Sequence, residues 1–335
     1  MNSSAVQPRS RVSFPGIHPS AWQHPADSLA LKTLKSIPGI DIALKTFFGA
    51  TTERSLRLIA LASAVRVNKK QFSRIHSIFL EACQILDIQE IPELYVSQNP
   101  FLNAGAVGMD KPFIVLNSAL VESTSDEELM GVLGHELGHI RSGHVLYKSL
   151  LAFMLRLSAL TLQIPLGGMA IAAIIAALKE WDRKSELSAD RAELLVTQDV
   201  ETSVRLLMKM AGGNLIDQMD LGEFIRQAKE YKESGDMVDN VFKIINLIDK
   251  SHPFPVLRVL ELIDWVQSGE YDRILRGFYP REETSWKEDA KKAKEDYAES
   301  FRETTRPFAE KISQKLEEAT EKAKDIFKYF TERNS

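Results

Sequence analysis

The sequence predicts a mainly helical α+β fold with a small β-sheet. Apolar residues recur at helical spacing along much of the 335-residue chain, for example over residues 126–141. Short β-type runs occur at residues 94–96 and 113–116, with a glycine-containing segment and a turn between them. The hydrophobic share of 44% and the charged share of 26% are ordinary for a globular protein. The length is ample for one large core plus appendages.

The N-terminal part combines a polar tail with predicted helices. Residues 1–25 contain many Ser, Pro and Gln residues, which indicates a flexible tail. They have no apolar core of the kind that marks a secretory signal peptide. A short amphipathic segment follows at residues 29–34 and is broken by Pro38 and Gly39. Helices are expected at residues 53–67 and 70–86.

The next predicted helix carries the residues with the strongest chemical signal. Its start is marked by Ser125 and Glu128, which have the spacing of a capping box. The segment His-Glu-Leu-Gly-His follows at residues 135–139. Because positions i and i+4 share one face of a helix, His135 and His139 can both bind one metal ion. Glu136 lies one residue off this pair, so it can contact a metal-bound water without binding the metal.

A second acidic cluster makes a chance pattern improbable. Glu186 and Asp190 are again four residues apart in a helical context. One of them can bind the metal while the other orients a ligand imidazole. Gly138 suits close packing beneath the metal. The alternative, two solvated helix faces with incidental His and Glu, explains this joint pattern less well.

With His252, Pro253 and Arg258 further on, these motifs resemble the M48 family of zinc metallopeptidases. The resemblance covers roughly residues 50–275 and is specific in its motifs. It implies a gluzincin-type metallopeptidase with one Zn²⁺ per chain. The multi-span membrane architecture of membrane-embedded family members is not matched, so their topology is not expected here.

The resemblance also implies roles for individual residues. It implies His135, His139 and Glu186 as zinc ligands, Glu136 as general base and a supporting role for Asp190. Gluzincins bind the substrate as an added strand along an exposed sheet edge. By resemblance, Asn103 and Ala104 lie on that edge. The alternative is a glycine-rich hairpin with no role in binding.

Three further residues have open alternatives. His252 precedes two prolines in a stiff loop, which the resemblance places at the mouth of the active site. It could stabilise the oxyanion, act as a reversible extra zinc ligand that shuts the site, or only cap a helix. Arg258 could pair with Asp190 or Glu193 or bind substrate carbonyls, and a structural salt bridge is the commoner fate. His144 lies off the ligand face and is expected behind the ligands or at the surface.

The least polar stretch is residues 149–178, where Arg156 is the single charged residue and Pro165 and two glycines interrupt the run. Each half is shorter than the ~20 residues of a spanning helix. Since His139 and Glu186 must meet at one metal, the chain between them crosses a bilayer an even number of times. Two full spans need ~40 apolar residues, which is more than residues 149–178 provide. A single span is excluded by the even number of crossings, and a double span is excluded by length. We therefore expect a helical hairpin, buried in the core or in contact with a membrane surface or a membrane protein, and we favour peripheral or shallow insertion.

The remaining features concern domains and compartment. Residues 26–278 are expected to form the peptidase domain, and residues 279–335 a charged tail that is a docked or coiled-coil helix, or a solvated segment. A net charge of −4 without a basic stripe excludes nucleic acid as an expected partner. The single cysteine, Cys83, is expected to be buried and excludes a disulfide framework. The expected location is therefore intracellular, in the cytoplasm with peripheral membrane association.

Together, these features predict a zinc-dependent endopeptidase. Its substrates are polypeptides, hydrolysed by Glu-assisted attack of zinc-bound water, and protein quality control at a membrane is the expected setting. The alternative function is a zinc-bearing chaperone-like or adaptor protein with a gated, poorly proteolytic site. The unligated carboxylate of Glu136 favours the enzyme, because a purely structural zinc site has no use for it.

Overall fold

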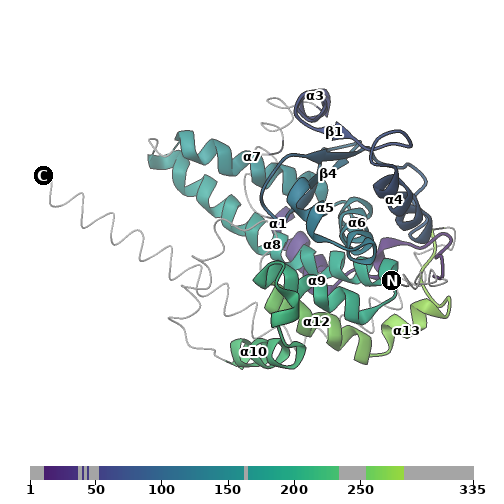
Figure 1. The fold of residues 1–335 in the computed structure, drawn as a ribbon. Helices are drawn as coiled ribbons and strands as arrows, with labels where there is room; N and C mark the ends of the chain where they lie inside the picture. The colour runs from purple at the N-terminus through teal and green to yellow at the C-terminus, as the bar shows by residue number, and fades with distance from the viewer. Residues whose placement is uncertain are drawn as a thin grey trace, which may run out of the picture. The chain divides into compact units, whose positions relative to one another are not determined.

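The computed structural model describes residues 11–36, 40, 44, 53–161, 165–233 and 254–282. His252 and most of the charged tail lie outside the described residues. The helices are α1 (Pro25–Lys35), α3 (Glu53–Ser63), α4 (Ser73–Ile85), α5 (Ser118–Ser123), α6 (Asp126–Arg141), α7 (Val145–Thr161), α8 (Pro165–Thr197), α9 (Val200–Gly212), α10 (Leu221–Glu233), α12 (Pro255–Gln267) and α13 (Glu270–Leu275) (Figure 1). All of them belong to the first of two compact units, Met1–Tyr279 and Pro280–Ser335.

Four short strands form one sheet, which confirms the predicted α+β class. The strands are β1 (Val65–Arg66), β2 (Leu94–Ser97), β3 (Ala104–Val107) and β4 (Phe113–Asn117). Their order is β1-β2-β4-β3, with β2 and β4 parallel and the other pairs antiparallel. Strand β3 is therefore at an edge of the sheet.

The helix predicted for residues 53–67 was too long. Helix α3 ends at Ser63, and Val65 and Arg66 form β1, where Val65 is the partner of Val96 in β2. The β-branched side chains of Val65 and Val67 suit a strand. The strand depends on a partner some thirty positions away, which helical periodicity does not reveal.

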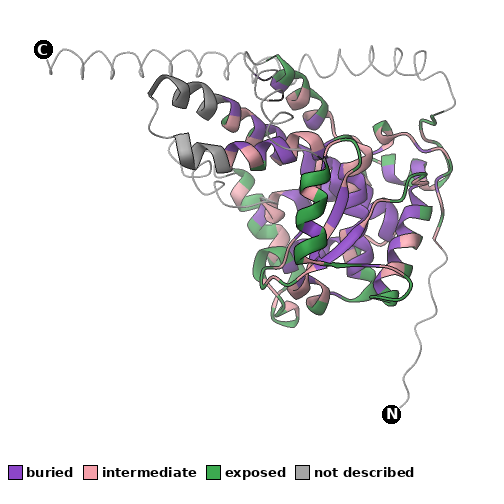
Figure 2. Ribbon diagram, turned by 90° about the horizontal axis from the view of Figure 1, so that it is seen from above, coloured by how far each residue is buried: buried purple, intermediate pink, exposed green. Residues whose placement is uncertain are grey.

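The two faces of the sheet are covered by different helices. Leu94, Val96, Ile114 and Leu116 belong to the main core, which they share with apolar residues of α4 and α6. On the other face, Tyr95 and Phe113 pack with Ala60 of α3. Strands β2 and β4 and most of α6 are buried, and Figure 2 shows buried residues gathered in the interior of the domain. Helix α6 is therefore enclosed between the sheet and the helices that follow it.

Glycines let α6 and α8 approach closely, as predicted for Gly138. A Cβ atom on Gly138 would lie 2.6 Å from Cβ of Ala192, and one on Gly134 would lie 2.7 Å from Cβ of Val196. Real Cβ atoms do not come this close, so larger residues would push the helices apart. The close approach brings the two predicted metal-binding segments together (Figure 1).

The N-terminal segment differs from the flexible tail predicted for residues 1–25. Phe14, Ile17 and Trp22 are fully buried in the main core. Helix α1 follows and packs along α8. The described part of this segment is thus part of the domain.

The base of the apolar hairpin packs against α1. Leu34 of α1, Leu150 of α7, and Leu178 and Trp181 of α8 are buried in a second core cluster. Among the described residues, no helix combines the length and the apolar character needed to cross a membrane. Cys83 is buried, as predicted, and burial raises the pKa of its thiol to about 12.

Candidate metal centre and active site

The start of α6 fixes the register of the helix, and the predicted capping box is present. The Ser125 hydroxyl accepts a hydrogen bond from the Glu128 N–H (3.2 Å), and the Glu128 carboxylate accepts one from the Ser125 N–H (2.9 Å). Lys209 of α9 lies 2.6 Å from the same carboxylate. These contacts satisfy backbone donors at the helix start. Three helical turns later, His135 and His139 face α8.

His135, His139 and Glu186 form a buried triad whose ligand atoms converge. The two Nε2 atoms are 3.1 Å apart, and the Glu186 oxygens lie 3.3 Å from Nε2 of His135 and 3.2 Å from Nε2 of His139. Neighbouring ligands of a tetrahedral metal with bonds of about 2.0–2.1 Å are roughly 3.3–3.4 Å apart. The triad therefore fits a tetrahedral metal ion and leaves one position for another ligand.

The surroundings of the two imidazoles shift their pKa values in opposite directions. Burial opposes protonation of His135, but Asp190 and Glu186 outweigh it and raise its pKa to about 9. Burial, assisted by Lys148, holds the pKa of His139 well below its ordinary value. Two Nε2 atoms in contact need one proton between them, which His135 supplies. A metal ion takes the place of that proton.

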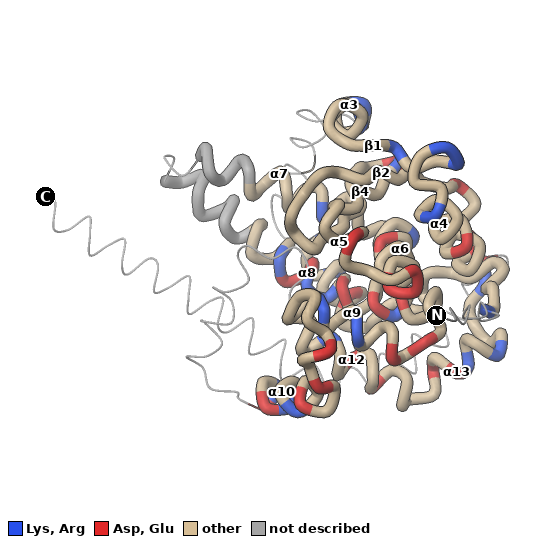
Figure 3. Tube along the Cα trace, viewed as in Figure 1, with Lys and Arg blue, Asp and Glu red and all other residues tan. Residues whose placement is uncertain are grey.

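Two cationic side chains hold Glu186. Lys148 lies 2.7 Å from Oε1 of Glu186 and 2.6 Å from Asp182, and Arg258 lies 3.2 Å from Oε2 of Glu186. Figure 3 shows acidic and basic positions along α8.

Charge balance gives a second test of fit. In the described cluster, the carboxylates are Glu136, Asp182, Glu186 and Asp190, and the cations are Lys148 and Arg258. With both imidazoles neutral, as metal ligands are, these carboxylates exceed these cations by two charges; a protonated His135 reduces the excess to one. A divalent cation would neutralise the difference, and buried charge is costly unless it is paired.

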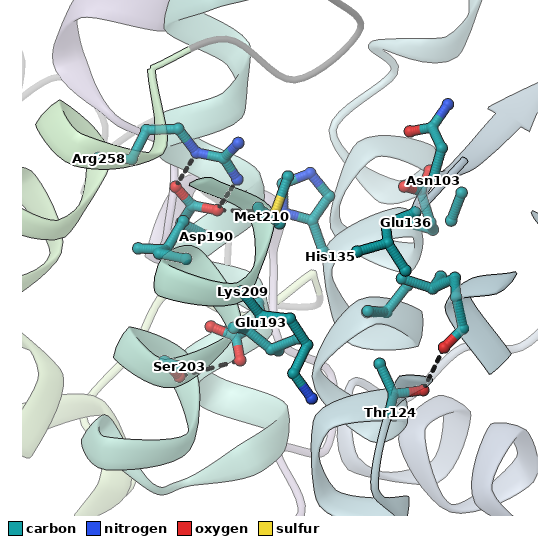
Figure 4. Close-up of a pocket in the computed structure, with 16 residues that line it drawn as sticks. Asn103, Thr124, His135, Glu136, Asp190, Glu193, Ser203, Lys209, Met210 and Arg258 are labelled. Carbon is teal, nitrogen blue, oxygen red and sulfur yellow. Dashed lines mark hydrogen bonds and ion pairs between the residues drawn. The ribbon is translucent and has the colours of Figure 1, made fainter. Parts of the chain in front are cut away.

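Asp190 links His135 to Arg258. Its Oδ1 lies 3.1 Å from Nδ1 of His135, and Arg258 binds both of its oxygens, with Nε at 2.7 Å from Oδ2. Burial opposes ionisation of Asp190, but the Arg258 guanidinium keeps its pKa below the ordinary value. Arg258 was expected to pair with Asp190 or Glu193 or to bind substrate carbonyls. In the structure it pairs with Asp190 (Figure 4).

Glu136 is bound to the edge strand and lines a cavity. Its Oε2 accepts a hydrogen bond from the backbone N–H of Ala106 (2.8 Å), and the side chain is 1% exposed. The cavity of about 60 Å³ also contains His135, Asn103 and Ala104. One water needs roughly 10–15 Å³, so several waters fit there. Asn103 and Glu136 lie on one side of it, opposite Glu193 (Figure 4).

The rest of the cavity lining is largely apolar. The apolar residues are Leu102, Leu120, Val132, Leu206, Leu207 and Met210. Glu193 and Ser203 add a buried polar pair, in which the Ser203 hydroxyl donates to Glu193 (2.9 Å). Burial raises the pKa of Glu193 to about 8, so the carboxyl is largely protonated at neutral pH.

His144 lies directly behind His139, in one of the two places expected for it, and Asp27, for which no role was predicted, lies behind His144. The Nδ1 atoms of His139 and His144 are 3.0 Å apart, and Nε2 of His144 lies 3.0 Å from Oδ2 of Asp27. Trp181 and Ser188 also donate to Asp27, at 3.1 and 2.7 Å. The imidazole of His144 was expected behind the ligands or at the surface, and it is fully buried.

Sequence comparisons agree with this geometry. The sequence model of peptidase family M48 matches residues 69–266. The plastoglobule-localized metallopeptidase 48, chloroplastic, of Arabidopsis thaliana is 38% identical over 269 residues, which are 78% of this chain and 77% of that protein. A protease HtpX homolog of Helicobacter pylori is 35% identical over 82 residues, 24% of this chain and 26% of its own. One from Fusobacterium nucleatum is 29% identical over 104 residues, covering 30% and 33%. No solved structure matches.

Proposed function

The chain belongs to peptidase family M48, and from this premise we propose that it is a zinc-dependent endopeptidase acting on polypeptides. The converging atoms of His135, His139 and Glu186 are the observation that carries the proposal. When bound there, Zn²⁺ supplies a Lewis acid that polarises the scissile carbonyl and lowers the pKa of a water molecule. Asp190 and Arg258 hold His135 in place, and Lys148 holds Glu186.

Glu136 serves as the general base. It lines the cavity beside His135, and the Ala106 N–H occupies one of its oxygens, which fixes the carboxylate towards the cavity. The carboxylate takes a proton from the attacking water and delivers it to the leaving amine. We retain His252 as the candidate for stabilising the oxyanion or closing the site, on the family resemblance alone.

The substrate backbone binds at the Asn103 end of β3. On the outer edge of this strand, the Ala106 N–H donates to Glu136, and the Gly108 N–H that follows donates to the Ser149 hydroxyl. Asn103 and Ala104, just before and at the start of the strand, line the cavity. Pairing between backbones there gives a grip that tolerates many sequences.

The apolar wall of the cavity selects an apolar substrate side chain. Val132 is one helical turn before His135, so a residue there controls the depth of the cavity beside the metal. A larger residue there should make the cavity shallower. A Val132→Phe variant should therefore prefer substrates with a smaller side chain at the position that enters this cavity. Cleavage-site profiling on a peptide mixture measures this shift, and an unchanged profile would assign the side-chain pocket elsewhere.

Metal content and cleavage together test the proposed activity. Wild type, Glu136→Gln and Glu186→Gln should be compared by zinc content and by cleavage of casein. Wild type should bind about one zinc and cleave, and Glu136→Gln should keep zinc while activity falls by at least about 100-fold. Glu186→Gln should lose most of its zinc.

Other outcomes would change the assignment. Loss of zinc in Glu136→Gln would remove Glu136 as the base, and a zinc-loaded, active Glu186→Gln would move the third ligand elsewhere. Zinc without any cleavage in wild type would favour the gated, chaperone-like alternative. His252→Ala then tests whether that residue closes the site.

We also propose that the chain contacts a membrane surface through residues 149–178. The apolar composition of this stretch and the name of the Arabidopsis relative, which calls that protein plastoglobule-localized, support the proposal. Vesicle flotation tests it with a variant carrying Ile164→Lys and Leu166→Lys. The control replaces the exposed Leu58 and Ile59 of α3 by Lys. Wild type and control should float and the hairpin variant should not, whereas equal flotation of all three would contradict the proposal.

A further inference from the structure

A chain of three buried groups extends from the triad to the N-terminal helix. His139 contacts His144 through their Nδ1 atoms, and His144 contacts Asp27 of α1 through Nε2, each at 3.0 Å. His139, His144 and Asp27 are each 0% exposed. The three side chains are therefore shielded from bulk solvent, and the contacts between them govern how their protons are shared.

The chemistry of the groups allows one arrangement of protons. A neutral His139 that binds a metal through Nε2 carries its proton on Nδ1. That proton is donated to Nδ1 of His144, which must then be an acceptor. His144 consequently carries its proton on Nε2, which lies 3.0 Å from Oδ2 of Asp27; this contact is an ion-pair distance, because the ring N–H is not aligned with the carboxylate oxygen.

We propose that Asp27 and His144 are positioning residues that hold His139 in the Nδ1–H form and keep its Nε2 lone pair directed at the metal. This inference rests on the proposed role of His139 as a metal ligand. It makes α1 a part of the metal centre, although Asp27 is more than a hundred positions before His139 in the sequence. Hydrogen bonds to a ligand imidazole fix its tautomer and raise its basicity, and their loss costs roughly 10–100-fold in metal affinity.

The surroundings of Asp27 reinforce this arrangement. Its Oδ1 accepts from the indole N–H of Trp181, and its Oδ2 accepts from the Ser188 hydroxyl and faces His144. Burial opposes ionisation of Asp27, but the contact with His144 outweighs it and the pKa is lowered, so the group is a carboxylate. Every group around it offers a proton.

An Asp27→Asn variant should reverse the chain of protons. The indole N–H of Trp181 can only donate, so the amide oxygen must face it. The amide NH₂ then takes the place of Oδ2 and donates to Nε2 of His144. His144 would carry its proton on Nδ1 and donate to His139, leaving the proton of His139 on Nε2, where the metal should bind.

The experiment measures zinc affinity by competition with a chromophoric chelator. Asp27→Asn should weaken zinc binding by roughly 10–100-fold. Ser188→Ala removes a neighbouring donor to the same carboxylate without changing any tautomer, so it is the matched control and should stay within about threefold of wild type.

A pair of variants at His144 tests the same chain without altering Asp27. Gln can accept from His139 through its oxygen and donate to Asp27 through its NH₂, whereas Leu can do neither. His144→Gln should therefore retain zinc affinity within about threefold, and His144→Leu should lose roughly 10–100-fold. Equal affinities for the Gln and Leu variants, with Asp27→Asn unchanged, would overturn the proposal.

A tautomer measurement separates this inference from the proposed function. Nitrogen-15 NMR of labelled histidines in the metal-free protein should show His139 protonated on Nδ1 in wild type and on Nε2 in Asp27→Asn, where His135 must in turn give up its Nε2 proton because only one proton fits between the two Nε2 atoms. If the His139 tautomer changes in this way but the wild-type protein binds no zinc, the metal site is rejected and the positioning roles of Asp27 and His144 are supported. Identical tautomers in the two proteins would overturn the positioning roles, whatever the zinc affinity.

Discussion

The two imidazoles of the triad are supported in different ways. His135 contacts Asp190, which is bound by the buried guanidinium of Arg258, so its support is an ion pair. Through Nδ1, His139 contacts a second imidazole, His144, and on that side the carboxylate, Asp27, is one residue further away. The support of His135 comes from Asp190 of α8 and Arg258 of α12. The support of His139 comes through His144 from Asp27 of α1. One ligand is therefore secured by charge and the other by the direction of its hydrogen bonds.

The two arrangements should fail differently. Removing one member of a buried ion pair leaves an unpaired charge, which acts on the stability of the whole domain. Reversing the chain of Asp27, His144 and His139 leaves no buried cation unpaired and acts mainly on metal affinity. Variants of the two sides can therefore be distinguished by comparing unfolding with metal binding.

The largest expected change in stability is on the charged side. Asp190→Asn should lower the free energy of unfolding by about 3–5 kcal/mol, because Arg258 keeps its buried charge without its main partner. Asp27→Asn should cost less, about 1–3 kcal/mol, because no buried cation depends on it. Urea unfolding of the two metal-free variants at pH 7 measures the difference. Equal losses would contradict the distinction between the two sides.

A pH-dependent effect should come from Glu193, one helical turn beyond Asp190. Its pKa is about 8 in the folded protein against an ordinary 4.5, so the folded state keeps a proton that the unfolded state loses. Its contribution to stability is present below pH 4.5 and is lost as the pH rises to about 8.

Glu193→Gln removes this titration. The variant should gain roughly 2–4 kcal/mol relative to wild type between pH 5 and pH 9. Urea unfolding at these two pH values provides the measurement, with Glu201→Gln on α9, an exposed site, as the control. Parallel pH profiles for wild type and Glu193→Gln would show that Glu193 ionises normally.

A smaller effect is expected from the helix contact that both sides share. Gly138→Ala places a Cβ atom 2.6 Å from Cβ of Ala192 and should cost about 1–3 kcal/mol while weakening metal binding. Gly105→Ala meets no atom within 4 Å and is the control. Thermal unfolding and zinc titration of both variants compare them. A Gly138→Ala protein as stable as the control would mean that α6 and α8 can separate freely.

The residues that support His135 could largely be predicted from the sequence, whereas those that support His139 could not. Helical spacing places Glu186 and Asp190 on one face, and family resemblance points to His135, His139 and Arg258. Asp27 gave no signal, because it lies in a short helix and is 161 positions from its partner Ser188. Lys148 was overlooked within an apolar helix, although an ammonium group there needs a buried acidic partner.

The fold shows the same division. Capping and periodicity predicted α6 and the continuation of α8, which are local properties. The strand at Val65 and the buried residues Phe14 and Trp22 depend on partners distant in the sequence. Local composition alone therefore misjudged the N-terminal segment as a tail.

The most direct test of the metal centre is anomalous diffraction at the zinc edge from crystals of the zinc-loaded protein. One peak should lie about 2.0–2.2 Å from Nε2 of His135, Nε2 of His139 and an oxygen of Glu186. Asp190 and His144 should lie beyond bonding distance. A peak bound by His144 or Asp190 in place of one of these three ligands, or no peak between α6 and α8, would contradict the proposed centre.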